Sequence, residues 1–390
     1  MFNPLTPVIM EDSSTRATAG ISSKASTNQI ETKTQLPKYH TKGGHGFAME
    51  DAHAIHDRQC GRVVDQCGRS NKLNGADRIV NGQPIQTKCC RTAARTFSSG
   101  FDSTTGQFRY AGQKFEVPSD QYSEIVQRMR QAISDGKVPG ISDPNQATDI
   151  VVKGRYTYAQ AKNMAKAGNL DSIKFDMRVQ AAACAFACGI SAGITFIIAK
   201  YNGESTGDAL KKAAVSGVKS AGVAMLGGVV AQQFLRTAAG RSCVAAATHA
   251  VRPMMQAAMK TELGKSVITK TASAVAGKSI TGAAAANVLT KAARTNVIVS
   301  GAMAVATTIP DAVKLCRGKI SGAEFCENTA CNVTSVGGGW AGASAGAAIG
   351  SLICPGVGTA IGGIIGGIAG GLGASIGTKK FICSLKNICA

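Results

Sequence analysis

The pattern of apolar and polar residues divides the chain into a mixed first part and a strongly apolar second part. Residues 41–170 contain short apolar runs with two-residue or helical spacing, separated by Gly, Asn and Pro. Residues 171–335 are rich in Ala and contain longer apolar segments, whereas residues 1–40 are rich in Ser, Thr and Lys and lack apolar periodicity. These patterns predict a disordered arm, an α+β domain and an all-α region, in that order.

Within residues 41–170, the apolar spacing predicts helices beside a small sheet. One helix is expected over the segment GGHGFAMEDAHAIHDRQ, and another from Ser119, a good N-cap residue, to Gly136. Two strands are expected around the Asn-Gly pair at 81–82, because this dipeptide favours the tight turn of a β-hairpin. A similar strand pattern surrounds the Ala-Gly pair at 111–112.

Two segments of the Ala-rich region are candidate membrane spans. Residues 179–199 carry no charge and are long enough to cross a bilayer as a helix. Residues 213–235 form a second apolar segment, interrupted by Lys219. A chain that enters the membrane and returns needs an even number of crossings, so these two segments are expected to form a pair.

Glycines at a spacing of four mark the clearest pattern, in residues 336–378. No charged residue lies between Glu327 and Lys379, and the repeated glycines are Gly338, Gly342, Gly346, Gly350, Gly358, Gly362, Gly366 and Gly370. On a helix, this spacing aligns the glycines in one groove, where two backbones can meet closely within lipid. The region resembles the glycine-zipper segments of bacterial membrane-associated proteins.

The glycine pattern predicts a helical hairpin that bends at the Pro-Gly pair at 355–356, followed by a basic, Cys-containing tail at 379–390. The glycine grooves also predict that copies of the chain self-associate as a homo-oligomer. The alternative structures are a flexible Gly-rich tail and a tightly packed pair of soluble helices.

The distribution of charged residues indicates where in the cell the protein lies. The net charge is +20 and the mean hydropathy is +0.05, and the apolar second part is the more basic one. Basic side chains beside apolar segments suit an anionic lipid bilayer, although nucleic acid is the other common partner of a basic chain. The first residues lack a basic region of the secretory type, and the tail contains three Lys residues. We therefore expect the protein in the cytoplasmic membrane, with the N-terminal domain in the cytoplasm.

Four residues in the α+β domain form a candidate site for chemistry. Asp77 is expected at the end of the first strand of the hairpin, and Gln86 and Lys88 lie two residues apart on the second strand. Alternate residues of a strand share one face, so Gln86 and Lys88 are expected to project together toward Asp77. Glu50 on the preceding helix supplies a further acid. Oxygen ligands for Mg²⁺ beside a lysine are what metal-dependent cleavage of a phosphodiester requires.

The order of these residues resembles that of the restriction-endonuclease-like PD-(D/E)xK nucleases, and most closely the Mrr-type branch, in which Gln replaces the last acid. The resemblance covers about residues 43–130 and implies a mixed sheet with flanking helices. It further implies that Asp77 is a metal ligand, that Gln86 lines the metal site, that Lys88 activates the water, and that Glu50 is a supporting acid. The sequence departs from the family pattern in lacking the proline before the aspartate.

The sequence is compatible with three functions. The first is a membrane-associated bacterial effector, of the toxin or defence type, with a Mg²⁺-dependent nuclease-like domain that acts on DNA or RNA. The second is a non-enzymatic pore-forming or scaffold protein whose N-terminal domain binds a partner. The third is a soluble nucleic-acid-binding protein with a Gly-rich tail. A zinc site on His53, His56, Cys60 and Cys67 is a separate alternative, although its ligand spacing is unusual.

Overall fold

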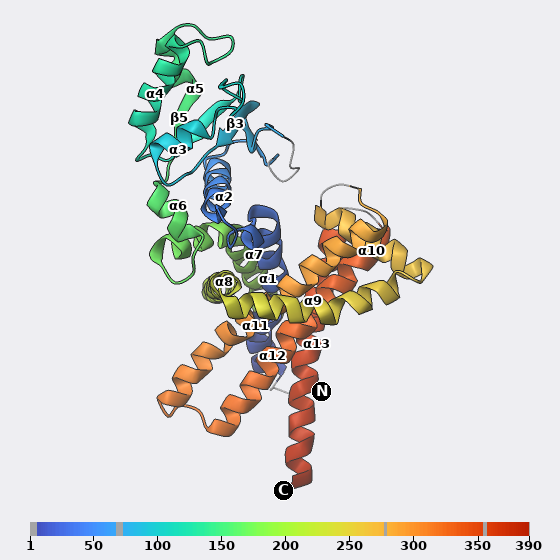
Figure 1. Ribbon diagram of the computed structural model, residues 1–390. Coiled ribbons are helices and arrows are strands. Elements are labelled where there is room, and N and C mark those ends of the chain that lie inside the picture. Colours follow the sequence, from blue (N-terminus) through green and yellow to red (C-terminus); the bar gives the residue numbers. More distant parts are fainter. Residues whose placement is uncertain (1–5, 68–72, 277–278, 354–356, 390) are drawn as a thin grey trace. The chain divides into compact units, whose positions relative to one another are not determined.

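The computed structural model describes residues 6–67, 73–276, 279–353 and 357–389 (Figure 1). The chain forms two compact units. The sheet unit consists of Lys33–Val179, and the helical unit consists of Met1–Thr32 together with Gln180–Ala390.

The sheet unit is built on a mixed five-stranded sheet in the order β1-β2-β3-β4-β5. Its strands are β1 (Val64–Asp65), β2 (Arg78–Val80), β3 (Gln83–Thr87), β4 (Lys114–Val117) and β5 (Val151–Lys153). The pairs β1–β2 and β2–β3 are antiparallel, whereas the pairs β3–β4 and β4–β5 are parallel. Helix α2 (Gly44–Gln59) precedes the sheet and confirms the first predicted helix.

The turn between β2 and β3 is the predicted Asn-Gly turn. Asn81 and Gly82 both have positive φ angles, of 48° and 84°, which a two-residue hairpin turn of this kind requires. The Ala-Gly pair at 111–112 behaves differently, because only β4 forms after it and the segment before it is not a strand. Parallel pairing of β4 with β3 replaces the expected local hairpin.

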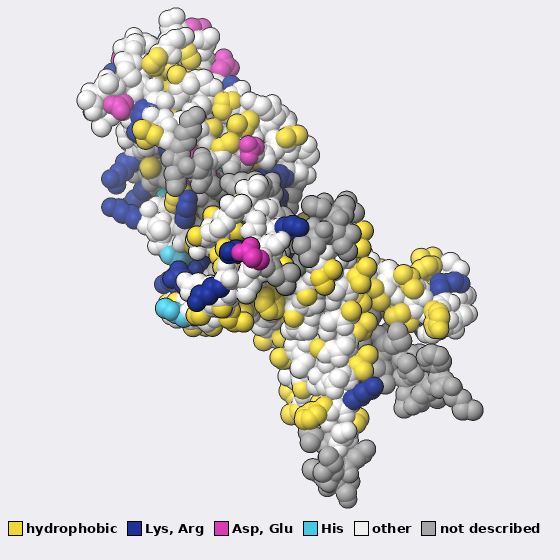
Figure 2. Space-filling model, turned by 90° about the vertical axis from the view of Figure 1, so that its right-hand side faces the viewer, with side chains coloured by type: hydrophobic (Ala, Val, Ile, Leu, Met, Phe, Trp, Pro, Cys, Tyr) yellow, Lys and Arg dark blue, Asp and Glu magenta, His cyan; other side chains and the backbone are white. Residues whose placement is uncertain are grey.

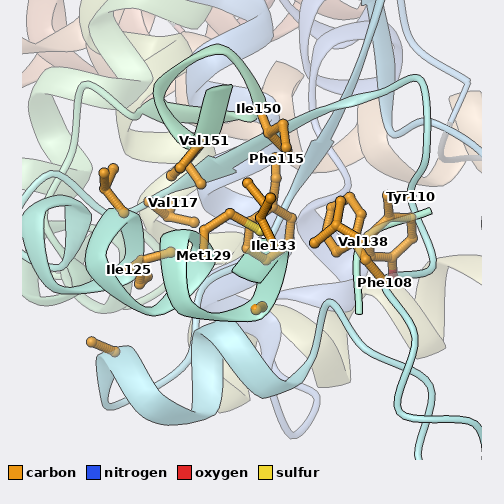
Figure 3. Packing of buried hydrophobic residues seen from close by; sticks show 14 residues of the cluster. Phe108, Tyr110, Phe115, Val117, Ile125, Met129, Ile133, Val138, Ile150 and Val151 are labelled. Carbon is orange, nitrogen blue, oxygen red and sulfur yellow. The ribbon is translucent and has the colours of Figure 1, made fainter. Parts of the chain in front are cut away.

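The core of the sheet unit lies between the parallel strands and the helices that follow β3. Phe115 and Val117 of β4 are fully buried against Ile125 and Met129 of helix α4 (Tyr122–Ser134), as Figure 3 shows. The remaining elements of the unit are η1 (Leu36–Lys38), α3 (Ala93–Ser98), η3 (Pro144–Gln146), α5 (Ala147–Ile150) and α6 (Tyr158–Met164). The aromatic residues around Phe108 close one end of this core.

The helical unit contains long helices with outward apolar side chains. They are α7 (Leu170–Tyr201), which begins in the sheet unit, α8 (Thr206–Leu235), α9 (Ala238–Ala258), α10 (Glu262–Ala276), α11 (Gly282–Cys316), α12 (Gly322–Ile353) and α13 (Val357–Cys389). Four helical segments of the described chain are long and apolar enough to cross a membrane: Leu170–Tyr201, Thr206–Leu235, Gly282–Cys316 and Ile361–Ser384.

Both predicted spans lie within the first two of these segments. Large apolar side chains on these helices are exposed, for example Ile197 at 68% and Val218 at 70%. In the face shown in Figure 2, hydrophobic and uncharged atoms cover most of the helical unit. Such exposed apolar surface on long helices is typical of a lipid-facing bundle.

Helices α12 and α13 confirm the predicted glycine-zipper hairpin. A Cβ atom on Gly342 would overlap the carbonyl oxygen of Gly366, and one on Gly346 would overlap that of Gly362. The two backbones therefore touch along an antiparallel seam that only glycine permits. In this structure the glycines of α12 contact those of α13 within one chain. The predicted association of separate copies through these glycines therefore stays a prediction. The predicted bend at 355–356 lies outside the described residues.

The first helix replaces the disordered arm that the sequence predicts for residues 1–40. Helix α1 (Thr6–Lys33) has too few apolar residues to show periodicity, but Ala19, Ile21 and Ile30 are buried. Its partners lie some three hundred residues away in the sequence, in α11 and α12. Local patterns carry no signal of such a partner, which explains the difference.

The close backbone contact in the hairpin predicts a sharp contrast between two glycines of α12. Gly342→Ala should lower the free energy of unfolding of the hairpin by roughly 1–3 kcal/mol, because a backbone carbonyl opposite it cannot move aside. Gly337→Ala is the control, since a Cβ there meets no atom within 4 Å. Denaturation in detergent micelles, followed by the fluorescence of the single Trp340 in α12, would measure both. Equal stability of the two variants would contradict this packing.

Candidate functional site

The hairpin of β2 and β3 places the predicted site residues opposite one another. Asp77 lies directly before β2, and its backbone N–H donates to the carbonyl of Ile85 on β3. This pairing brings the Asp77 carboxylate to Gln86, whose Nε2 donates to Oδ2 at 2.6 Å. The backbone N–H of Thr87 donates to the same oxygen at 2.8 Å. The expected meeting of Asp77 and Gln86 across the hairpin is thus present.

Gln86 keeps one polar atom without a partner. Gln86 is 3% exposed, and its Oε1 is buried and accepts no hydrogen bond from any residue that the structure describes. A buried amide oxygen left unpaired costs about 1–3 kcal/mol of stability. Such an atom beside a carboxylate is the arrangement that a cation or an ordered water would satisfy.

Glu50 of α2 completes a cluster of acids at this point. Burial and, to a smaller extent, the nearby carboxylates of Asp77 and Asp51 raise the pKa of Glu50 to about 8, against the lowering effects of Lys88 and of the hydrogen bond from Gln35. Burial also raises the pKa of Asp77, against the lowering effects of Lys88 and of the hydrogen bonds from β3. Carboxylates held together against their mutual repulsion are typical of sites that hold a cation.

Lys88 follows β3. Its positive charge lowers the pKa of both Glu50 and Asp77. Its Nζ lies 5.3 Å from the ring centroid of Tyr110, within the range of a cation–π contact. Tyr110 is itself 4% exposed and stacks on Phe115 of the core. The side chain of Lys88 is therefore supported by a buried aromatic ring, and no motif in the sequence marks this ring as part of the site.

The donor set fits a divalent cation with oxygen ligands. Asp77 and Glu50 offer carboxylates, and the unpaired Oε1 of Gln86 offers a neutral oxygen. All are hard oxygen ligands of the kind that Mg²⁺ binds, with water completing the coordination. Within the described residues, no three or more His, Cys, Asp and Glu side chains form a group that could hold a metal. The site thus depends on Gln86 for its third protein oxygen.

A network of buried charges lies next to this cluster and fixes α2 to the sheet. Arg78 of β2 forms an ion pair with Glu116 of β4 at 2.7 Å and another with Asp57 of α2 at 3.1 Å. Nδ1 of His53 lies 2.7 Å from Glu116, and the hydroxyl of Thr87 donates to the same carboxylate. The carboxylate of Glu116 thus belongs to this network of ion pairs and hydrogen bonds.

The zinc alternative does not agree with the positions of the histidines. Nε2 of His53 accepts the backbone N–H of Arg155 at 3.0 Å, and Nδ1 faces Glu116. Both ring nitrogens of His53 are therefore engaged within the protein. His56 and Cys60 lie near each other, with Sγ 3.6 Å from Nε2 of the imidazole, but no further ligand joins them in the part of the chain that is described.

The fold is that of a membrane protein whose chain combines a mixed α/β unit, which carries an acidic cluster, with a helical unit that contains a glycine-zipper hairpin. Residues 27–134 match the family model of the YeeR C-terminal domain, and residues 324–377 match that of a C13G5.2-like glycine zipper domain. The chain is 48% identical over 99 residues to the inner membrane protein YeeR of Escherichia coli (strain K12). The aligned part covers 24% of this chain and 19% of YeeR.

These matches confirm the membrane protein and the glycine zipper, and the chain is related to a bacterial inner membrane protein. The third function from the sequence analysis, a soluble protein with a Gly-rich tail, does not agree with these matches. The glycine region forms two helices, α12 and α13, that pack as a hairpin. Neither matched model is described as a nuclease. No solved structure matches the chain.

The buried network predicts acid sensitivity of the sheet unit. Burial alone would raise the pKa of Glu116, but His53 and Arg78 lower it below its usual range. A carboxyl with a lowered pKa stabilises the fold above its unfolded pKa of about 4.3, and this contribution is lost as the pH falls below that value. The protection factors of the β4 amides in the full chain, which compare the hydrogen-exchange rate with the intrinsic rate at each pH, should therefore fall from about pH 4 downward.

Substitution of Glu116 tests the same network at neutral pH. Glu116→Gln leaves Arg78 without its bidentate partner and should destabilise the sheet unit by about 3–5 kcal/mol. Glu124→Gln is the control, since Glu124 forms an exposed ion pair with Arg128 and should cost about 0.5 kcal/mol or less. A Glu116→Gln variant as stable as the control would show that the network contributes nothing.

Proposed function

We propose that the protein is a membrane-anchored, metal-dependent phosphodiesterase that cleaves nucleic acid, with its active site at Asp77, Glu50, Gln86 and Lys88. The observation that carries the proposal is the 2.6 Å hydrogen bond between Gln86 and Asp77, beside the unpaired Oε1 of Gln86. The order of helix, strand and strand that presents these residues supports the resemblance to the PD-(D/E)xK nucleases.

Each residue has one task in this proposal. Asp77 and Glu50 hold Mg²⁺ through carboxylate oxygens, and Gln86 adds its amide oxygen. Mg²⁺ held by these oxygens would supply Lewis acidity toward the scissile phosphate and the attacking water. Lys88, steadied by Tyr110, orients that water and offsets the negative charge that develops on the phosphoryl oxygens.

The surface near Lys88 supports a polyanionic substrate. Arg91 and Arg95 follow Lys88 in the chain, and both are exposed. The sheet unit and the helical unit both belong to a chain with a net charge of +20. Lysine and arginine side chains bind phosphates of nucleic acid without regard to sequence, so DNA and RNA are both substrates to be tested.

The helical unit anchors this activity to the inner membrane. The candidate spans would hold the chain in the membrane, and the Lys residues after α13 favour the cytoplasmic side for the end of that helix. The sheet unit then faces the cytoplasm, where nucleic acid is available. A nuclease held at the membrane suits a bacterial effector of the toxin or defence type.

A second function is favoured by one observation. The described residues contain no group of three or more acids, His or Cys that could hold a metal. If two carboxylates are too few, the sheet unit binds a partner without cleaving it, and the protein acts through its membrane bundle as a pore-former or scaffold. The two functions differ in their dependence on Asp77 and Lys88.

Substitutions of single site residues separate these functions. Asp77→Asn and Lys88→Ala should each lower Mg²⁺-dependent cleavage of DNA or RNA by at least about 100-fold, since each removes a group that acts in the transition state. The measurement is a nuclease assay of the full chain in lipid nanodiscs, with and without Mg²⁺.

Matched controls for this assay lie on the surface of the same unit. Asp149→Asn removes an exposed carboxylate, and Lys153→Ala removes an exposed lysine on β5. Both controls should keep wild-type activity. If the wild-type protein cleaves neither nucleic acid, or if the site variants match the controls, the catalytic proposal is refuted and the second function remains.

A further inference from the structure

Arg178 of α7 lies at the edge of the first candidate membrane span. Residues 179–199, which follow it on the same helix, carry no charge, and the next charged residue is Lys200. Basic side chains at the end of such a span lie among the lipid headgroups, where anionic phosphates are found. The continuity of α7 therefore sets Arg178 at the level of these phosphates.

The phenol of Tyr156 holds the side chain of Arg178 within the sheet unit. Nη1 of Arg178 donates to the hydroxyl of Tyr156 at 2.6 Å. Nε2 of Gln59, the last residue of α2, donates to the backbone carbonyl of Arg178 at 3.4 Å. The ring centroid of Tyr156 lies 5.2 Å from that of His53, which is also on α2. These contacts fix the guanidinium group of Arg178 beside α2.

A second guanidinium group, that of Arg155, lies at the same place. The backbone N–H of Arg155 donates to Nε2 of His53 at 3.0 Å, which fixes this segment against α2. Burial raises the pKa of Tyr156, whereas the positive charges of Arg178 and Arg155 lower it. Arg155 is exposed and Arg178 is half-buried. Two arginines therefore act on one phenol, at a place that solvent can reach.

The imidazole of His56 lies in the same positive field. Nη1 of Arg155 lies 3.4 Å from Nε2 of His56. Burial lowers the pKa of His56, and so do the positive charges of three arginines: Arg155, Arg178 and Arg62. The carboxylate of Asp57 acts in the opposite direction. Three guanidinium groups thus gather around the end of α2.

The acid beside these arginines is already paired with other partners. Asp57 forms ion pairs with Arg62 at 2.9 Å and with Arg78 at 3.1 Å. Among the residues that the structure describes, no carboxylate forms an ion pair with Arg155 or Arg178; their side chains contact a phenol and an imidazole instead. Neighbouring guanidinium groups repel each other, and an anion between them would offset this repulsion. The planar fork of an arginine matches two oxygens of a phosphate group.

We propose that Arg155, Arg178 and Tyr156 form a binding site for the phosphate of an anionic phospholipid. Both guanidinium groups donate to phosphate oxygens. The hydroxyl of Tyr156, which accepts from Arg178, donates its own hydrogen to the same phosphate. A phospholipid presents its phosphate at the level of Arg178, whereas the backbone of a nucleic acid would have to enter the headgroup layer. This lipid site is independent of the nuclease activity proposed above.

The site is tested by native mass spectrometry of the full chain in neutral detergent micelles, with phosphatidylglycerol as the probe. Arg155→Gln and Arg178→Gln should each weaken binding of the first phosphatidylglycerol by at least about tenfold, because each removes a charged donor to the phosphate. Tyr156→Phe keeps the ring beside His53 but removes the hydroxyl, and it should weaken binding by about three- to tenfold.

The matched control is Arg130→Gln, which removes an exposed arginine of α4 and should keep wild-type affinity. Hydrogen exchange of the α2 amides should match that of the wild-type protein in every variant. Since Arg155 is exposed, Arg155→Gln decides the question even if Arg178→Gln disturbs the fold. Wild-type affinity of Arg155→Gln for phosphatidylglycerol would overturn the site.

Other probes identify the source of the phosphate. Phosphatidylcholine, whose headgroup has no net charge, should bind at least about tenfold more weakly than phosphatidylglycerol. Inorganic phosphate and a single-stranded oligonucleotide, each in molar excess, should leave the lipid bound. Displacement by inorganic phosphate would make a free phosphate the occupant, and displacement by the oligonucleotide would make it a nucleic acid. Either displacement, or equal affinity for the two lipids, would overturn the proposal, and none of these results depends on nuclease activity.

Discussion

The antiparallel pairing of β2 with β3 is the constraint on which the candidate site depends. Two residues with positive φ, Asn81 and Gly82, close the turn, and this fixes the register of the hairpin. The register alone sets Asp77 opposite Gln86 and lets one carboxylate oxygen accept both the side-chain and the backbone hydrogen bonds from β3. A slip of one residue would turn Gln86 to the other face and dissolve the cluster.

Around this hairpin, two sets of polar contacts hold α2 in place. The buried pairs of Arg78 with Glu116 and Asp57 join β2, β4 and α2, and they fix the helix that carries Glu50. From the other end of the helix, Gln35 reaches Glu50 directly. The acids of the site are thus kept close in spite of their repulsion, because the ion pairs beside them hold α2, β2 and β4 together.

Much of this architecture could be predicted from local patterns. The Asn-Gly pair at 81–82 predicted the hairpin, the uncharged segment at 179–199 predicted a span, and the four-residue glycine period predicted the α12–α13 hairpin. The helix α1 could not be predicted, since its partners on α11 and α12 are distant in sequence and its own face is made of Ser, Thr and Gly. For the same reason, Gln35 and Tyr110 carried no signal: their importance comes from what the fold places beside them.

The central claim is that Asp77, Glu50 and Gln86 form a divalent-cation site, and crystals of the full chain grown with Mn²⁺ test it most directly. The account predicts an anomalous scattering peak at about 2.0–2.3 Å from a carboxylate oxygen of Asp77 and from Oε1 of Gln86. It also predicts that the peak disappears in Asp77→Asn. A map with no peak there, in crystals that show Mn²⁺ bound elsewhere or not at all, would contradict the account.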